Sequence, residues 1–282
     1  MDPAAKVFVP GGGVIGREEP FIRADDLGVL RGDGLFETMH VRAGRPWLVA
    51  EHLARLARSA AAIALELPPA AALTELLEAA CDGWPAETEA ALRLLCTRGP
   101  EHGGPPTIYA TITAVAPRAL RQRAEGIRVG TLSLGVAATA RTDLDWLPAG
   151  MKTLSYGAST AAARWAAAHD LDDILWISTD GYALEGPTSS LVWCDGDTLC
   201  TVPAARTGIL PSVTTNWLLA HAGELGLRGA ERMVTPAELS GAAGVWLLSS
   251  VRGPAEVTTL DGAALSRSPH TPGLRRLLGF PV

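Results

Sequence analysis

One lysine is the residue of this chain best suited to covalent chemistry. The sequence holds 24 lysines and arginines, and among them only Lys6 and Lys152 are lysines. Lys6 stands among the first residues, where chain termini are often loose, whereas Lys152 lies mid-chain in the stretch GMKTLSYG (150–157). An arginine keeps its proton near neutral pH, but a desolvated lysine can lose it, and the neutral amine can attack a carbonyl. Lys152 is therefore a candidate nucleophile; the alternative is a surface lysine in an arginine-rich chain.

Two arginines could be either exposed on the surface or directed into the protein. Arg55 lies beside the apolar face of a predicted helix, so it is either a solvated helix charge or a side chain that leans into the protein. Arg93 interrupts an otherwise apolar strand predicted over residues 90–97. It either faces outward or is an inward charge that awaits an anionic ligand.

Composition argues against several classes of protein. The chain has 282 residues, 48% of them hydrophobic, which is enough for one large or two medium domains with a substantial core. The net charge of −6 disfavours a nucleic-acid partner. The four cysteines form no CxxC pair and the six histidines form no HExxH motif. No metal site is therefore expected, and the thiols are expected to be reduced and buried.

The first residues and the apolar runs bear on location in the cell. Met1–Val9 lacks the apolar core of a signal peptide. No apolar run approaches the roughly 18 residues of a membrane span. We therefore expect a cytoplasmic protein without a membrane partner.

The spacing of apolar and turn residues predicts alternating strands and helices. The expected strands are a hairpin over 6–23 and the segments 35–41, 46–49, 90–97, 107–115, 127–136, 173–178, a strand within 182–194, 198–202, 244–250 and 258–262. Helices are expected after residue 50, over 70–82 and 155–169, from residue 211, and, as a capping-box start, from residue 235. The polar segment 118–125 shows no apolar period and is expected to be an interdomain linker.

A glycine pattern near the N-terminus needs separate interpretation. Gly11, Gly13 and Gly16 match GxGxxG, but dinucleotide binding needs a helix that opens at the glycines. Arg17–Pro20 follows instead, without an apolar helical period. A glycine-rich hairpin turn is the better interpretation.

Seven short motifs occur in one order: RGDGLFET, HLARL, TRG, MKTL, LEGPTSSL, GILPSVTT and LLSS. Together they resemble the class IV pyridoxal-phosphate enzymes, a family of branched-chain and D-amino-acid aminotransferases and aminodeoxychorismate lyase. The resemblance implies an α/β (α+β) two-domain fold of type IV: a small N-terminal α/β domain (1–117), the linker (118–125) and a larger C-terminal pseudobarrel domain (126–282). It also implies a homodimer whose partner loops close the substrate side. The segment 27–31 and the loop after Thr97 are the expected lid.

Pyridoxal 5'-phosphate is the cofactor that the resemblance implies. Lys152 matches the lysine that bonds to it and that, once released by substrate, shuttles protons at the reacting carbon. Glu185 matches the acid that faces the pyridine nitrogen. A carboxylate there keeps that nitrogen protonated, so that the ring can accept electrons. Without the resemblance, Glu185 is an ordinary hairpin glutamate.

The phosphate of such a cofactor needs fixed donors. Arg55 in HLARL matches the family's phosphate arginine. Val213 and Thr214 match a helix start whose backbone amides and hydroxyl hold phosphate oxygens, because the first amides of a helix lack partners and its dipole is positive there. Ser250, with Ser249 beside it, is a further expected donor. A phosphate held in this way needs no metal.

The substrate side distinguishes members of the family. The stretches ADDLGVLRGDGLFET, STDGYALEGPTSSLV and LLSSVRGPAEVTTLDG are most similar to actinobacterial aminodeoxychorismate lyases. That similarity implies conversion of 4-amino-4-deoxychorismate to 4-aminobenzoate and pyruvate, for folate biosynthesis. D-amino-acid aminotransferases carry an arginine shortly after TRG, which TRGPEHGGPPT lacks, and Ala91 replaces the usual tyrosine of branched-chain enzymes. Arg93 is the candidate for the substrate carboxylate in branched-chain enzymes and lyases alike.

Two departures keep an alternative open. Enterobacterial lyases have KHLN where this chain has KTLS, and they have threonine where Glu37 stands. Glu37 is common among the aminotransferases. The prediction is therefore a pyridoxal-phosphate-dependent lyase, and the alternative is a class IV aminotransferase that acts on D-amino acids, branched-chain amino acids or amines.

Overall fold

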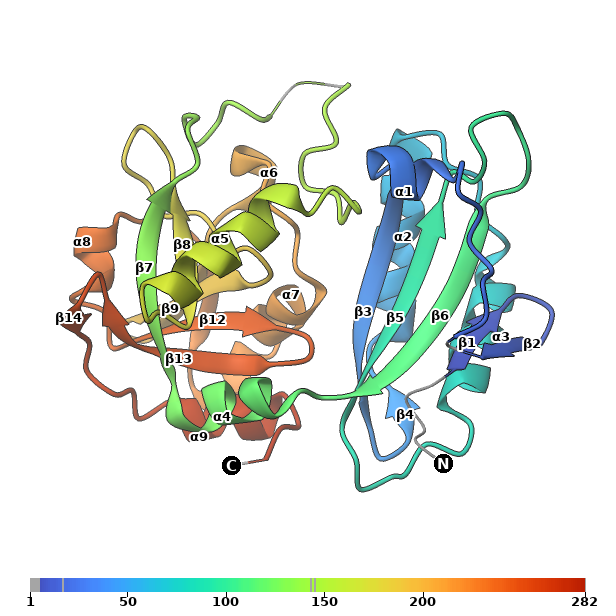
Figure 1. Ribbon diagram of the computed structural model, residues 1–282. Coiled ribbons are helices and arrows are strands. Elements are labelled where there is room, and N and C mark those ends of the chain that lie inside the picture. Colours follow the sequence, from blue (N-terminus) through green and yellow to red (C-terminus); the bar gives the residue numbers. More distant parts are fainter. Residues whose placement is uncertain (1–5, 17, 143, 145, 282) are drawn as a thin grey trace. The chain divides into compact units, whose positions relative to one another are not determined.

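The computed structural model describes residues 6–16, 18–142, 144 and 146–281. The chain forms two compact units (Figure 1): Met1–Ala116 with Met151–Tyr156, and Pro117–Gly150 with Gly157–Val282. The segment that carries Lys152 was expected in the C-terminal domain, but it belongs to the first unit. The expectation that residues 1–9 are not a signal peptide lies partly outside the described residues.

A six-stranded antiparallel sheet forms the first unit, in the order β2-β1-β6-β5-β3-β4. Its strands are β1 (Lys6–Val9), β2 (Gly13–Gly16), β3 (Gly34–Arg42), β4 (Arg45–Pro46), β5 (Ala90–Thr97) and β6 (Thr107–Ala114). The strands predicted over 35–41, 90–97 and 107–115 are confirmed. The strand predicted over 46–49 is shorter than expected, because the following helix already begins at Val49.

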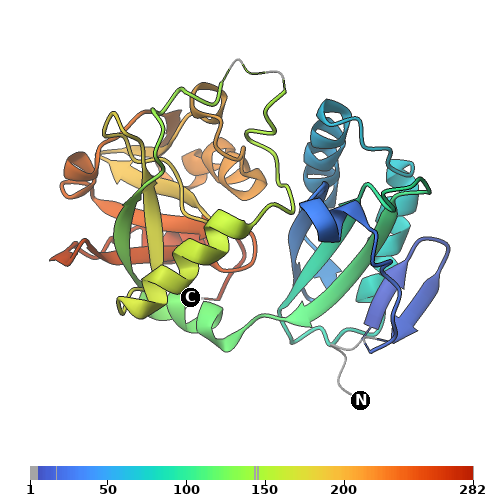
Figure 2. The same cartoon turned by 45° about the horizontal axis from the view of Figure 1, so that its top comes forward.

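Helices α2 (Val49–Ala62) and α3 (Ala70–Cys81) cover one face of this sheet (Figures 1 and 2). Side chains of a strand alternate between its two faces. Leu35 and Met39 of β3 therefore point towards the helices and join Leu56 of α2 in the core. Phe36, Thr38 and His40 alternate with these residues and stand on the other face, which is called the second face below.

The N-terminal hairpin expected over residues 6–23 is confirmed in β1 and β2. It turns at Gly11 and Gly12, whose φ angles of +84° and +83° suit a residue without a Cβ atom. These glycines thus form a turn between strands rather than a helix start, as the sequence indicated. Lys6 is not in a loose terminus, since it opens β1 and pairs with Gly16.

The two segments expected to form a lid are joined to each other. Helix α1 (Leu27–Arg31) is capped by Asp26, which is fully buried. The Asp26 carboxylate also accepts hydrogen bonds from the hydroxyls of Thr97, at 2.9 Å, and Thr107, at 2.6 Å. The first amide of α1 donates to the Gly99 carbonyl at 2.9 Å. Asp26 therefore fastens α1 to the ends of β5 and β6, and closure over a substrate stays a prediction.

An eight-stranded sheet of mixed direction forms the second unit. Its order is β11-β10-β9-β12-β13-β7-β8, with β14 beside β13. The strands are β7 (Ile127–Ser133), β8 (Asp173–Ile177), β9 (Ser190–Asp195), β10 (Thr198–Thr201), β11 (Arg228–Glu231), β12 (Gly244–Ser249), β13 (Gly253–Leu260) and β14 (Ala263–Ala264). The core of the unit packs against this sheet, with Trp193 and Leu247 among its fully buried side chains.

Residues 183–185 close this sheet into a ring. The Trp176 amide on β8 donates to the Glu185 carbonyl at 2.9 Å, and the Leu184 amide donates to the Trp176 carbonyl at 2.9 Å. On its other side, Glu185 bridges to Ser190 at the start of β9. A sheet that closes on itself protects its edges. The expected α/β fold class, with a pseudobarrel in the C-terminal part, is confirmed.

The helices of the second unit are α4 (Pro117–Glu125), α5 (Gly157–Ala168), α6 (Ala204–Thr207), α7 (Val213–Ala220), the 3-10 helix η1 (Ala222–Leu225), α8 (Pro236–Leu239) and α9 (Thr271–Leu277). Residues 118–125, expected to be a linker, instead form most of α4, which packs on β13. Arg123 is buried and donates to the carbonyls of Val251, at 3.0 Å, and Arg252, at 2.8 Å. Such a helix needs no apolar period, because hydrogen bonds from its arginine fasten it. Within the described residues, no helix is both long and apolar enough to cross a membrane.

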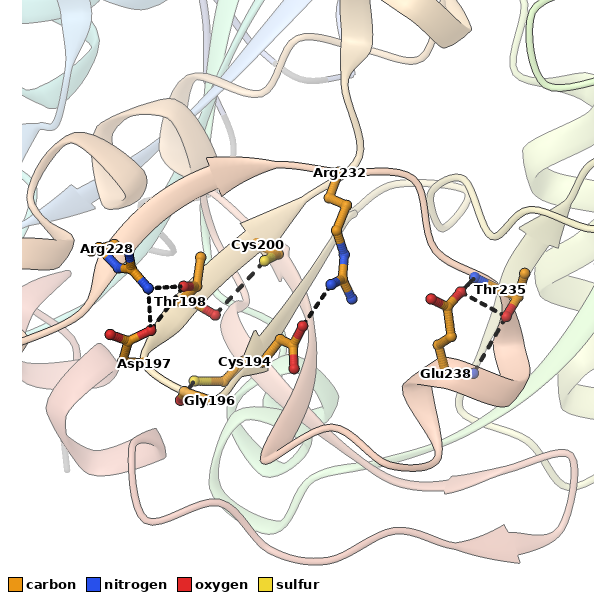
Figure 3. Close-up of polar contacts among 10 residues, drawn as sticks. Cys194, Gly196, Asp197, Thr198, Cys200, Arg228, Arg232, Thr235 and Glu238 are labelled. Atoms are coloured by element: carbon orange, nitrogen blue, oxygen red, sulfur yellow. Dashed lines mark hydrogen bonds and ion pairs between the residues drawn. The ribbon is translucent and has the colours of Figure 1, made fainter.

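Polar contacts around β9, β10 and α8 are shown in Figure 3. Arg232 donates to Asp195 at 2.6 Å, beside the turn that joins the two strands. Thr235 and Glu238 form the capping box that was predicted to begin a helix: Glu238 N donates to Thr235 Oγ1 at 3.4 Å, and Thr235 N donates to Glu238 Oε2 at 2.8 Å. The local signal in the sequence was therefore sufficient for α8.

The four cysteines are free thiols and buried, as predicted. Burial raises the pKa of Cys96 to about 12 and the pKa of Cys81 to about 11. Cys194 and Cys200 contact backbone carbonyls of the β9–β10 turn region (Figure 3). These thiols are packing residues rather than nucleophiles.

Candidate active site

Lys152 lies on a short extension of the first unit's sheet. Its carbonyl accepts a hydrogen bond from the Phe36 amide at 2.9 Å, and the Leu154 amide donates to the Gly34 carbonyl at 3.0 Å. The segment thus pairs with the outer edge of β3, which is why it belongs to the first unit. The sequence could not show this pairing, because more than a hundred residues separate the two strands.

The Lys152 side chain lies against an aromatic pair. Its Nζ lies over the Phe36 ring, 4.4 Å from the ring centroid, and the ring face attracts a cation. Phe36 in turn makes an edge-to-face contact with Tyr156, with centroids 5.2 Å apart. Met151, the preceding residue, packs on the core between sheet and helices. Lys152 is half-buried as a residue, and its amine lies on the second face of the sheet with Phe36.

Arg93 stands on the same face as the Lys152 amine. Strand β5 lies between β3 and β6, and its register places Arg93 opposite Thr38. Thr38 and Phe36 are two residues apart on β3, so their side chains share a face. Arg93 is exposed and donates to Thr113 Oγ1 at 3.3 Å. It therefore lies on a central strand, directed away from the helix-covered core.

Arg55 is buried in a charged cluster between α2 and β3, so it is not a solvated helix charge. Its Nε donates to Glu37 Oε1 at 2.8 Å, and its Nη2 donates to Glu37 Oε2 at 2.6 Å. The His52 Nδ1 lies 2.7 Å from the same Oε2 atom. Glu37, His52 and Arg55 are 1%, 0% and 5% exposed. We call these three residues the Glu37 cluster.

The partners of Glu37 decide its ionisation. Burial by itself would raise the pKa of this carboxyl, but hydrogen bonds from His52 and Arg55, together with the Arg55 charge, outweigh burial and hold the pKa at about 2. Glu37 is therefore ionised at neutral pH. An ionised carboxylate is costly to bury unless it is paired and hydrogen-bonded, and Glu37 meets both conditions.

Glu185 occupies the segment that closes the ring of the second unit. Its backbone is held on one side by Trp176 and on the other by Ser190. Its Oε2 accepts a hydrogen bond from the Leu210 amide at 3.3 Å, in the loop that leads into α7. The carboxylate is therefore attached to a rigid part of the sheet, where it can face a cationic group.

Helix α7 begins where the sequence predicted. Ser212 is its N-cap, and the Ser212 Oγ accepts from the Thr215 amide at 3.2 Å. Val213 and Thr214 are the first two helical residues, and both are buried. The first amides of this eight-residue helix provide positive partial charge at a single point.

Ser250 is brought to the start of α7. Its Oγ lies 2.7 Å from the Thr214 Oγ1, although 36 residues separate the two. Ser249 has a different task, since its Oγ accepts from the Arg252 amide at 3.3 Å in the turn between β12 and β13. The structure thus separates Ser250, the serine predicted as a donor, from its neighbour Ser249. We call Thr214 and Ser250 the hydroxyl pair.

The donor types present fit pyridoxal phosphate. The first unit offers an amine and an oriented guanidinium, and the second offers a fixed carboxylate, a helix N-terminus and the hydroxyl pair. Phosphate accepts hydrogen bonds from guanidinium, amide and hydroxyl groups, and a carboxylate suits a protonated pyridine. The roles assigned to Lys152, Arg55, Glu185, Val213, Thr214 and Ser250 stay predictions.

Sequence reasoning missed several contacts of these residues. Glu37 was noted only as a departure from one branch of the family, and His52 was not considered. The available signal was that His52 and Arg55 are three residues apart on α2, so that both side chains reach the same neighbour. Phe36, whose ring lies beneath Lys152, belongs to the predicted strand over 35–41. Nothing in the sequence indicated that this ring would contact the lysine.

Comparison with known proteins agrees with these observations. Residues 34–260 match the class IV aminotransferase family. Over 258 residues the chain is 40% identical to the bifunctional aminodeoxychorismate lyase / D-amino acid transaminase of Mycobacterium tuberculosis, and the match covers 89% of each protein.

Solved structures with the same fold also cover nearly the whole chain. The PLP-bound form of a hypothetical aminotransferase from Mycobacterium tuberculosis has a TM-score of 0.93 and 37% identity, over 98% of this chain and 97% of that one. The fold IV transaminase CpuTA1 from Curtobacterium pusillum has a TM-score of 0.90 and 34% identity, over 98% and 97%. This protein is therefore a member of the class IV aminotransferase family.

Proposed function

We propose that this protein is a pyridoxal-phosphate-dependent 4-amino-4-deoxychorismate lyase, which releases 4-aminobenzoate and pyruvate. The observation that carries the proposal is the 40% identity, over 89% of the chain, to a bifunctional aminodeoxychorismate lyase / D-amino acid transaminase. The amine of Lys152, on the second face of the first unit's sheet, supports it, because a lyase of this kind needs a nucleophilic amine that can also move protons.

Each candidate site residue has a role in this proposal. Pyridoxal phosphate, when bound, supplies a carbonyl for an amine to attack and a pyridinium that accepts electrons. Lys152 would hold the cofactor through Nζ and, once the substrate amine has released it, would take the proton from the ring carbon that bears the substrate's amino group. Glu185 would keep the proton on the pyridine nitrogen, while Arg55 and the hydroxyl pair would bind the phosphate.

Arg93 is the proposed contact for a substrate carboxylate. It lies on the same sheet face as the Lys152 amine and is exposed on that face. A guanidinium binds a carboxylate through two parallel hydrogen bonds. Replacement by methionine is expected to raise KM more than it lowers kcat, because it removes a binding group rather than the base.

A second candidate activity is transamination of D-amino acids. The 40% identical relative from Mycobacterium tuberculosis is named for this activity as well, and the reaction would use the same lysine for proton transfer. It differs from the lyase reaction in one requirement: a 2-oxo acid must accept the amino group. That requirement makes the two activities separable in one preparation.

The first experiment measures pyruvate release from enzymatically prepared 4-amino-4-deoxychorismate without any 2-oxo acid. Steady release, with an equal amount of 4-aminobenzoate and loss of both in Lys152→Ala, supports the lyase. No turnover by protein that binds the cofactor through Lys152 contradicts it. D-Alanine with 2-oxoglutarate then tests transamination, and 2-oxoglutarate alone is the control.

A further inference from the structure

The Glu37 cluster places charge where apolar side chains would pack. Leu35 and Met39, the neighbours of Glu37 on the same face of β3, are fully buried in the core. Well-packed apolar residues are often as stable as a buried ion pair, or more stable. A gain in folding stability is therefore not a sufficient reason for a carboxylate at position 37. The contacts of Glu37 point instead to a functional role.

The contacts of Glu37 fix the plane of one guanidinium. Each of its two carboxylate oxygens accepts from a different nitrogen of Arg55, at 2.8 and 2.6 Å. His52 holds the carboxylate itself, with Nδ1 2.7 Å from Oε2. Two parallel bonds allow one orientation of a planar group, whereas one bond would allow rotation.

We propose that Glu37 is a positioning residue that orients Arg55 towards the cofactor phosphate, and so sets the preference for the phosphorylated cofactor over pyridoxal. This inference rests on the proposed use of pyridoxal phosphate. Glu37 itself repels phosphate, so its contribution comes only through the guanidinium. His52, which contacts the carboxylate and lies three residues before Arg55, keeps Glu37 aligned with the helix.

Orientation and charge make different predictions at position 55. A lysine there would keep the positive charge, but its ammonium is a point charge that cannot be held in one plane by two oxygens. If orientation matters, Arg55→Lys loses phosphate preference despite its charge. Glu37→Gln removes the charged partner and is expected to act on the same property.

The test measures two dissociation constants, for pyridoxal phosphate and for pyridoxal, by absorption of the cofactor bound to Lys152. Their ratio is the phosphate preference. Glu37→Gln is expected to lower this ratio by about 10- to 100-fold, the range expected for losing a hydrogen bond of a charged group. Pyridoxal affinity should stay nearly unchanged, since pyridoxal has no phosphate for Arg55 to contact.

A matched control is available on the same sheet. The Glu89 carboxylate lies 2.8 Å from the Nε2 of His40, which is a residue of β3, so it also pairs with a buried histidine. Glu89→Gln removes the same charge away from Arg55 and should change the ratio by no more than about twofold. Equal losses in Glu89→Gln and Glu37→Gln would overturn the proposal.

Non-additivity shows whether Glu37 acts through Arg55. In Arg55→Lys protein the ratio should already be low, and adding Glu37→Gln should lower it little further. Independent, additive losses overturn the positioning role. Glu37→Asp keeps the charge and guards against misfolding of Glu37→Gln; it should give an intermediate ratio in protein with an unchanged Tm.

The outcomes also separate this inference from the proposed function. If wild-type protein binds neither pyridoxal phosphate nor pyridoxal, the proposed cofactor is wrong. If wild-type protein prefers pyridoxal phosphate and Glu37→Asp or Glu37→Gln keeps that preference, only the role of Glu37 is wrong.

Discussion

The Glu37 cluster of the first unit and the hydroxyl pair of the second unit are two different ways to prepare donors for an anion. The first is a set of buried charges, with Glu37 and Arg55 held together by two hydrogen bonds. The second is neutral: Thr214 and Ser250 share one hydrogen bond at the start of α7. The cluster offers the full charge of one guanidinium, whereas the pair relies on the local field of helix amides.

The difference lies in what each arrangement needs from the rest of the protein. A buried guanidinium without its carboxylate is an uncompensated charge, and removing one partner of a buried pair commonly costs about 3–5 kcal/mol. A hydroxyl that loses its neighbour can rotate to another acceptor, at a cost of about 1 kcal/mol. We therefore expect the cluster to be sensitive to pH and substitution, and the hydroxyl pair to be tolerant.

The largest effect is expected when the covalent bond between Lys152 and the cofactor is removed. This change separates cofactor binding from catalysis. Lys152→Ala should lower kcat by at least about 1000-fold, because the base and the point of attachment are both lost. If the cluster and the pair hold the phosphate, pyridoxal phosphate should still be retained non-covalently. Equilibrium dialysis against the cofactor measures this; complete loss of binding would contradict the comparison.

Acid should affect the cluster and leave the pair unchanged. The pKa of Glu37 lies at about 2, below its ordinary value of 4.5, so the folded state binds this proton less readily than the unfolded state. The stability from this carboxylate is therefore present above pH 4.5 and is lost as pH falls towards 2, to a total of about 3 kcal/mol.

Urea unfolding between pH 2 and pH 6 tests this sign. The gap in unfolding free energy between wild type and Glu37→Gln should shrink as pH falls through this window. Thr214→Val should show a gap that does not depend on pH, since neither hydroxyl titrates. A constant gap for Glu37→Gln would show that the pKa of Glu37 is not depressed.

Substitution in the Glu37 cluster should weaken cofactor binding more than substitution in the hydroxyl pair. Arg55→Met removes a charged donor and should weaken pyridoxal phosphate binding by about 100-fold, whereas Thr214→Val should weaken it by about tenfold. Phosphate-free pyridoxal is the control ligand and should be affected little by either change. Equal losses would mean that charge gives the cluster no advantage over the neutral pair.

The smallest effect separates the two serines. Ser250→Ala should weaken cofactor binding by about threefold to tenfold, because Thr214 loses its hydroxyl partner. Ser249→Ala should leave cofactor affinity unchanged and lower Tm slightly, since the Ser249 hydroxyl accepts from the Arg252 amide in a turn. The reverse order would place Ser249 rather than Ser250 at the phosphate.

Local patterns accounted for most of the secondary structure. An apolar run predicted β5 with its observed bounds, and the capping-box residues Thr235 and Glu238 predicted the start of α8. Helix α4 was missed because its side chains are mostly polar, and it is fastened by Arg123 to carbonyls that come 128 and 129 residues later. Hydrophobic periodicity cannot indicate a contact of that kind.

The sequence by itself determined the family, through motif order, and it identified Lys152 as the candidate nucleophile. It also located the start of α7, because an N-cap serine acts on amides only a few residues away. Only the tertiary structure decided that the Lys152 segment pairs with β3, that Arg55 is held by Glu37, and that Ser250 rather than Ser249 meets Thr214. Each of these depends on pairing between distant segments, which register and packing determine and residue type does not.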